Sequence, residues 1–308
     1  MRTLAMTMAM AALLHSAAAW AGEGLVLSSS ALPPEVRRTL AAEIAEAKAA
    51  QPQAFETMAA LYGKMNALDQ KKRGRLAALS PYLRAMGPEA LWPALELLAF
   101  EAPPMPLTPS AALSLRLGLI EAVGRLREPK AAPVWVALLN SQQPESAVYR
   151  SAAQALGFLG TDEAAAQLLA SSREGGPRGA AVRAGMGSCR RLVVAQALAG
   201  ALARTGDEAE AAALAKALGE VANAWAWKTP AVAAKDEEPQ VRATAAKALV
   251  KAYLRFPGFA RQAASNALMV VDAPITGALI DQARSGASEE ELASLQALAA
   301  RWEKNPTR

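Results

Sequence analysis

The feature that most constrains the fold of this chain is a set of apolar residues that recur at the spacing of an α-helix. In residues 148–159 these are Val148, Ala152, Ala155, Leu156 and Leu159. The same spacing returns between Val241 and Tyr253. Such a stripe is typical of a helix that buries one face. Since alternation of the β type is nearly absent and good helix formers dominate, the sequence predicts an all-α protein.

The expected helices also repeat in pairs. Residues 122–131 superimpose on 155–164 at a spacing of 33, and the pattern returns at 201–209 with one residue deleted at the turn. Each copy is expected to form a helix, a short Gly/Asp/Pro turn and a second helix, which Asp162 or Asp207 would cap. A unit of this size cannot bury its apolar face alone, so the copies are expected to stack.

The repeated segments resemble a known family. Residues 155–169 carry the phrase Ala-Leu-Gly-x-Leu-Gly-Thr-Asp-Glu-Ala-x-x-x-Leu-Leu, with relatives at 122–139, 201–214 and 241–249. They resemble HEAT repeats, in particular the short bacterial repeats of phycobilin-lyase-like proteins. This resemblance, which covers residues 108–262, implies a right-handed α-solenoid of helical hairpins with a concave protein-binding surface. It carries over no catalytic residue, and Ala203 departs from the glycine that is usual there.

Proline and glycine indicate the boundaries within the chain. The expected parts are an N-terminal helical region of degenerate repeats at 22–101, a Pro-rich joint at 102–110 and a repeat array at 111–308. Two insertions, at 171–179 and 223–239, are expected to interrupt the array. The sequence Ser288-Glu-Glu-Glu291 predicts a capping box at the start of a C-terminal capping helix.

The first residues predict export. Arg2 supplies a positive charge, residues 4–14 are apolar and uncharged, and Ala19-Trp20-Ala21 fits the pattern of a signal-peptide cleavage site. Residues 1–21 are therefore expected to be a signal peptide that is cleaved after Ala21, which makes the protein periplasmic or secreted. Residues 192–203 are apolar but too short for a membrane span, so no transmembrane span is expected in the mature chain.

The composition excludes most catalytic machinery. The one histidine, His15, lies in the expected signal peptide, so the mature chain has no imidazole for a Ser-His-Asp or Cys-His mechanism or for a usual zinc site. The one cysteine, Cys189, is interpreted as a buried or incidental residue. Glu208 and Glu210 are two positions apart and would not face each other on a helix. The sequence therefore favours a protein with no catalytic residue, no cofactor and no metal.

Candidate binding residues form two groups. Trp225 and Trp227 lie in the second insertion, where an extended backbone would project both rings to one side as a stacking platform. The alternative is that they cover the edge of the solenoid. The second group is basic and comprises Arg178, Arg183, Arg190 and Arg191. These arginines are candidates for contact with an anionic polymer, or they are ordinary surface charges.

These patterns predict a monomeric, non-catalytic binding or scaffold protein of the bacterial cell envelope. Its expected partner is another envelope or secreted protein, seated on the solenoid surface. Export argues against a nucleic acid partner. Two alternatives stay open, namely an envelope hydrolase that uses carboxylates from different repeats, and a binder of an anionic envelope polymer.

Overall fold

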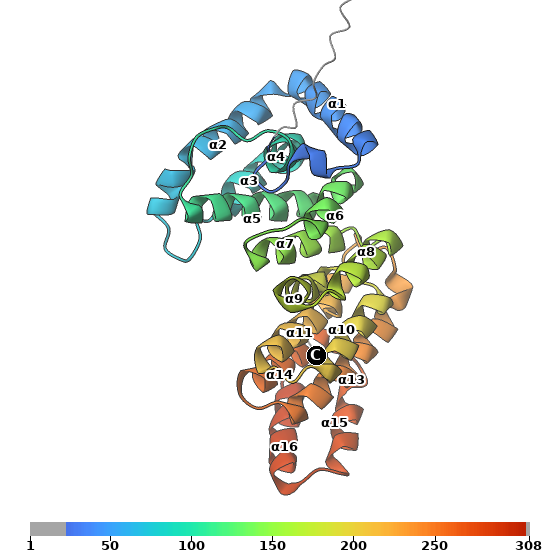
Figure 1. Cartoon of the computed structure of the whole chain (residues 1–308). Coiled ribbons are helices and arrows are strands. Elements are labelled where there is room, and N and C mark those ends of the chain that lie inside the picture. The colour runs from blue at the N-terminus through green and yellow to red at the C-terminus, as the bar shows by residue number, and fades with distance from the viewer. Residues whose placement is uncertain (1–22, 306–308) are drawn as a thin grey trace, which may run out of the picture.

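The structure of the protein is a computed structural model that describes residues 23–305. These residues are mostly helical, and their only β-type pairing is an isolated bridge between Glu23 and Ser28. Figure 1 shows an elongated stack of helices that runs from α1 to α16. The prediction of an all-α fold is confirmed. The expected signal peptide, residues 1–21, lies outside the described residues.

The N-terminal region contains four helices: α1 (Pro34–Ala50), α2 (Pro52–Gln70), α3 (Ser80–Met86) and α4 (Leu91–Ala99). An extended segment before α1 lies along the end of α4. There the Leu25 N–H donates to the carbonyl of Leu97 at 2.8 Å, and the Val26 N–H donates to that of Leu98 at 3.1 Å. Gly24 permits this approach, because a Cβ there would lie 2.4 Å from the Leu98 carbonyl oxygen. The segment thus becomes part of the core.

The remaining helices form two layers (Figure 1). The first layer contains α5 (Pro109–Leu126), α7 (Ser146–Gly157), α9 (Gly176–Gly185), α11 (Glu208–Val221) and α14 (Gly258–Val271). The second contains α6 (Ala132–Asn140), α8 (Asp162–Ser172), α10 (Leu192–Arg204), α13 (Glu238–Arg255) and α15 (Thr276–Arg284). The short helix α12 (Ala224–Trp227) follows α11, and α16 (Glu289–Glu303) ends the stack. This is the arrangement of an α-solenoid.

The predicted apolar stripes face the core. Val148, Ala152, Ala155 and Leu156 are buried on α7, while Leu159 is half-buried just beyond its end. On α13, Val241, Ala245, Leu249, Ala252 and Tyr253 are buried, and Lys247 and Lys251 are exposed. One hydrophobic cluster extends from Val26 to Trp302, so the N-terminal region and the array share a core.

The caps of the second helices differ partly from expectation. Asp207 caps α11 as predicted, because its carboxylate accepts from the Glu210 N–H at 2.7 Å. For α8 the prediction is wrong by one residue. The cap is Thr161, whose hydroxyl accepts from the Ala164 N–H at 3.2 Å, and Asp162 is already helical.

The third copy of the predicted hairpin, 201–209, has a different position in the stack. It joins α10 in the second layer to α11 in the first, whereas the turns after α5 and α7 lead from the first layer to the second. The local pattern of helix, turn and helix is present in all three. The similarity therefore reflects shared turn chemistry rather than equivalent positions in the solenoid.

The first predicted insertion is smaller than expected, whereas the second lies close to its predicted range. At 171–179, α8 continues to Ser172 and α9 begins at Gly176, because Pro177 is tolerated in the first turn of a helix. At 223–239 the chain forms α12 and a 3-10 turn, Lys235–Glu237, before α13 begins at Glu238. The Pro-rich joint predicted at 102–110 is non-helical as far as Thr108. This residue caps α5, which begins at Pro109.

Candidate functional site: a groove across four helices of the first layer

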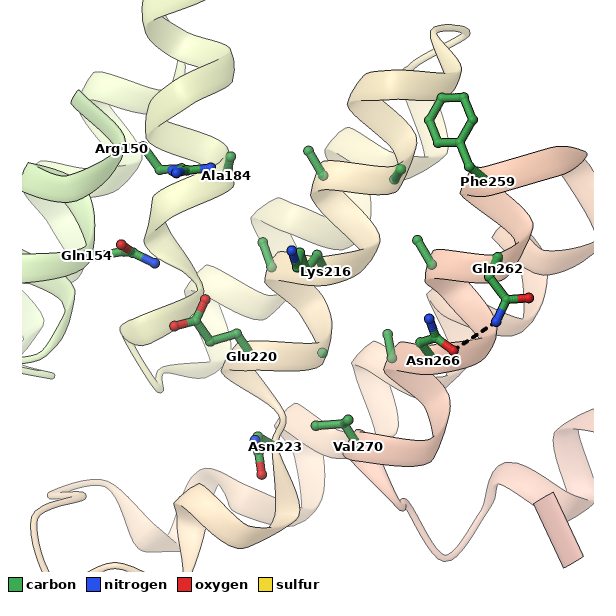
Figure 2. A pocket seen from close by; sticks show the side chains of 16 residues that line it. Arg150, Gln154, Ala184, Lys216, Glu220, Asn223, Phe259, Gln262, Asn266 and Val270 are labelled. Carbon is green, nitrogen blue, oxygen red and sulfur yellow. Dashed lines mark hydrogen bonds between the residues drawn. The ribbon is translucent and has the colours of Figure 1, made fainter. Parts of the chain in front are cut away.

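A groove of about 940 Å³ crosses α7, α9, α11 and α14 on the face that the first layer turns away from the second. Figure 2 shows the side chains that line it. Its small side chains come from α9, α11 and α14, and they are Ala184, Ala212, Ala213, Ala217, Gly219, Ala263 and Ala267. Because these side chains are short, the helix backbones themselves form the floor.

The packing of α11 on α14 explains part of this floor. A Cβ at Gly219 would lie 3.0 Å from the Cβ of Ala267, so small residues at both positions let the two helices approach closely. Two large apolar side chains stand on the rim at α14. Phe259 is 56% exposed and Val270 is 40% exposed. They lie near the two ends of α14, with Ala263 and Ala267 between them, and give this side of the groove exposed apolar surface.

The other half of the groove is polar. Arg150 and Gln154 come from α7, and Lys216 and Glu220 come from α11 (Figure 2). Within residues 23–305, neither Arg150 nor Lys216 forms an ion pair or a side-chain hydrogen bond. Burial raises the pKa of the Glu220 carboxyl, and the positive charge of Arg190 most strongly opposes this rise.

The two predicted tryptophans do not form a shared platform. The Asn223 side chain accepts from the N–H groups of Trp225 and Ala226, at 2.9 and 3.2 Å, and starts the helical turn α12. Trp227 is only 1% exposed, and its Nε1 donates to the Val221 carbonyl at 2.9 Å. Trp225 is 60% exposed, and Lys228 Nζ lies 4.3 Å from the centroid of its ring. The expected extended backbone is therefore wrong, since residues two apart on a helix do not face the same side.

Three of the four candidate arginines form ion pairs with carboxylates. Arg178 pairs with Glu174 at 3.0 Å and donates to the Leu139 carbonyl. Arg183 pairs with Glu210 at 2.5 Å and donates to the Ser172 carbonyl at 2.8 Å. Arg191 pairs with Asp162 at 2.6 Å and with Glu237 at 2.8 Å. These side chains join neighbouring elements of the solenoid and do not form one cationic patch.

Arg190 differs from the other three. It is half-buried, and its Nη1 donates to the Ser188 carbonyl at 3.3 Å. Its Nε is buried without a hydrogen-bond partner. Burial lowers the pKa of the Arg190 guanidinium, while the charge of Glu220 raises it. Arg190 therefore forms no ion pair within residues 23–305, and Glu220 is the nearby carboxylate whose charge acts most strongly on it.

The remaining candidates for catalysis, which are Cys189 and the carboxylates Glu208 and Glu210, do not form a common site. Cys189 is fully buried, and burial raises the pKa of its thiol to about 12 against the opposing charges of Arg191 and Arg190. Glu210 is bound to Arg183 and Thr205, and Glu208 accepts from the Ala260 N–H at 3.4 Å. No group of three or more His, Cys, Asp or Glu side chains within residues 23–305 is placed to hold a metal ion.

The sequence did not reveal the groove. In the sequence Arg150 and Gln154 lie outside the apolar stripe of residues 148–159, and nothing in their spacing connects them to Phe259 or Val270. These residues become neighbours because α7, α9, α11 and α14 follow one another in the first layer. The order of the layers was needed to find the site.

Comparison with known proteins supports the repeat architecture. Residues 107–184, which extend from α5 into α9, match the model of the family described as HEAT repeats. No curated protein and no solved structure was found to match. HEAT repeats commonly mediate contacts between proteins and are typically non-catalytic. None of the helices within residues 23–305 is long and apolar enough to cross a membrane. Residues 107–184 are therefore similar to HEAT repeats, and the two stacked layers of helices form an all-α solenoid, the fold that such repeats build.

Proposed function

We propose that this protein is a non-catalytic scaffold of the bacterial cell envelope, and that it holds another envelope or secreted protein in the groove across α7, α9, α11 and α14. The observation that carries this proposal is the groove itself. It has an apolar floor, exposed Phe259 and Val270 on one rim, and unpaired Arg150 and Lys216 on the other half. Protein interfaces usually combine an apolar centre with polar groups at the rim, and this groove combines an apolar floor with polar groups on one side.

Photo-crosslinking in the native host tests the groove. A photoreactive phenylalanine analogue at Ala213, on the groove floor, is expected to form an adduct with one partner protein. The same analogue at Lys247, which is exposed on α13 in the second layer, serves as the control and is expected to give no such adduct. Equal adducts at both positions, or adducts at Lys247 alone, contradict the proposal.

The location in the envelope is supported by the sequence of residues 1–21. Protein purified from its host is expected to begin at Gly22 and to occur in the periplasmic or secreted fraction. N-terminal sequencing of each cell fraction checks this. An intact Met1 on cytoplasmic protein contradicts the location, but it leaves the groove as a binding site to be judged by the crosslinks.

A further inference from the structure

We infer that the partner segment held in this groove is a peptide that is acidic along one edge and apolar along the other. Its carboxylates contact Arg150 and Lys216, and its apolar side chains contact Phe259 and Val270. This inference rests on the proposed function, because it names the chemistry of the segment that the groove holds.

The charges of the groove support an acidic edge. Arg150, Lys216 and Glu220 are the charged residues among those that line it. The positive charges of Arg190, Lys216 and Arg150 all act on the Glu220 carboxyl and oppose the rise of its pKa, so cations outnumber carboxylates around this residue. Within residues 23–305 neither Arg150 nor Lys216 forms an ion pair, and with one carboxylate against two cations the lining of the groove has a net positive charge. Both side chains are exposed and accessible to a ligand.

The opposite wall supports an apolar edge. The residues that α14 contributes to the groove carry no charge: Phe259, Gln262, Ala263, Asn266, Ala267 and Val270. The two amides of this wall bind each other, with Gln262 Nε2 donating to Asn266 Oδ1 at 2.9 Å (Figure 2). A uniformly charged polymer would leave the apolar surface of Phe259 and Val270 in water. A peptide with both kinds of side chain uses the whole groove.

Selection from a random peptide library displayed on phage tests this inference. The full chain is expected to enrich peptides in which Asp or Glu alternates with apolar residues. The double variant Arg150→Glu/Lys216→Glu is expected to enrich Lys and Arg instead. The control is Lys247→Glu/Lys251→Glu, which changes the net charge equally on the exposed face of α13 and is expected to select the same peptides as the parent.

Fluorescence anisotropy with one selected acidic peptide gives the magnitude. Reversal of both groove charges is expected to weaken binding roughly tenfold at low salt, and the difference is expected to shrink as salt is added. Since Arg150 and Lys216 are exposed, the melting temperature of the double variant is expected to match that of the parent.

The outcomes separate this inference from the function on which it rests. If the selected peptides are apolar and not enriched in Asp or Glu, and if Phe259→Ala weakens their binding, the acidic edge is overturned and the groove remains a binding site. Selected peptides whose binding ignores both Phe259→Ala and the charge reversal overturn the groove as a binding site. A third outcome is that no acidic peptide is selected, while dextran sulfate binds equally well to the parent and to Phe259→Ala. In that case Arg150 and Lys216 bind an anionic polymer, and the inference of a peptide ligand is overturned.

Discussion

At the scale of single residues, Trp225 and Trp227 show how backbone conformation decides the role of a side chain. Trp227 is buried and hydrogen-bonded to the Val221 carbonyl, whereas Trp225 is 60% exposed. Trp227→Ala is therefore expected to lower the free energy of unfolding by about 3–5 kcal/mol, because it leaves a cavity. Trp225→Ala is expected to change it little. Urea denaturation of both single variants checks this, and equal losses would contradict the assignment of Trp227 to the core.

Cys189 gives a second prediction at this scale. Burial raises the pKa of its thiol to about 12, so at neutral pH almost no nucleophilic thiolate is present in the folded protein. Alkylation by iodoacetamide is expected to be slow in native buffer and fast in urea. Since the folded pKa is higher than the ordinary value, the thiol stabilises the fold below pH 9, and this contribution is lost as the pH rises toward 12.

The control for this prediction is Cys189→Ser. This variant is expected not to be alkylated. Its free energy of unfolding is also expected to fall less at alkaline pH, because it has no thiol to ionise. Rapid alkylation of the native parent at pH 7 would show that Cys189 is accessible and would contradict its burial.

At the scale of the element, α16 gives the clearest case of a helix start that the sequence predicts. The Glu291 N–H donates to the Ser288 hydroxyl at 3.4 Å, and the Ser288 N–H donates to the Glu291 carboxylate at 2.8 Å. Ser288→Ala is expected to lower the free energy of unfolding by about 1 kcal/mol, because it removes one side of this capping box. Thermal denaturation checks this, and the control is Ser285→Ala, which removes the bond from an exposed hydroxyl to the Gln282 carbonyl but leaves the capping box intact.

Deletion of residues 288–308 tests the same helix as a cap of the stack. Leu295, Leu298 and Trp302 of α16 are buried, and its removal would expose the apolar surface that they cover. The truncated chain is expected to lose solubility. If it remains as soluble as the parent in sedimentation assays, α16 is not a cap.

The same elements show how far sequence patterns lead. The stripes at 148–159 and 241–253 predict α7 and α13 and their buried faces, because helical spacing is a local property. The turns are harder, since Thr161 and Asp162 are both good caps and only the backbone decides between them. Residues 201–209 match the pattern of an earlier turn, yet they connect the layers in the opposite direction. That direction depends on stacking, which neither helix encodes by itself.

At the scale of the whole molecule, the groove and the stability of the solenoid follow from the stacking of neighbours. Each central helix packs on helices before and after it, whereas α15 and α16 have neighbours on one side only. Most ties between segments are therefore local. An exception is Arg127 at the end of α5, whose Nη1 donates to the Ala231 carbonyl at 2.7 Å across 104 residues of sequence.

This long-range bond leads to the last prediction. Arg127 anchors residues 228–234, the segment between α12 and the 3-10 turn before α13 that has no helix of its own. Arg127→Ala is expected to speed amide hydrogen exchange in this segment and to leave α15 and α16 unchanged, because opening in a stacked array is local. The matched control is Arg125→Ala, because the Arg125 side chain pairs with Glu121 on its own helix. Exchange that rises uniformly along the chain in Arg127→Ala would show that the array unfolds as one unit, and unchanged exchange at 228–234 would show that the Arg127 bond does not hold the segment.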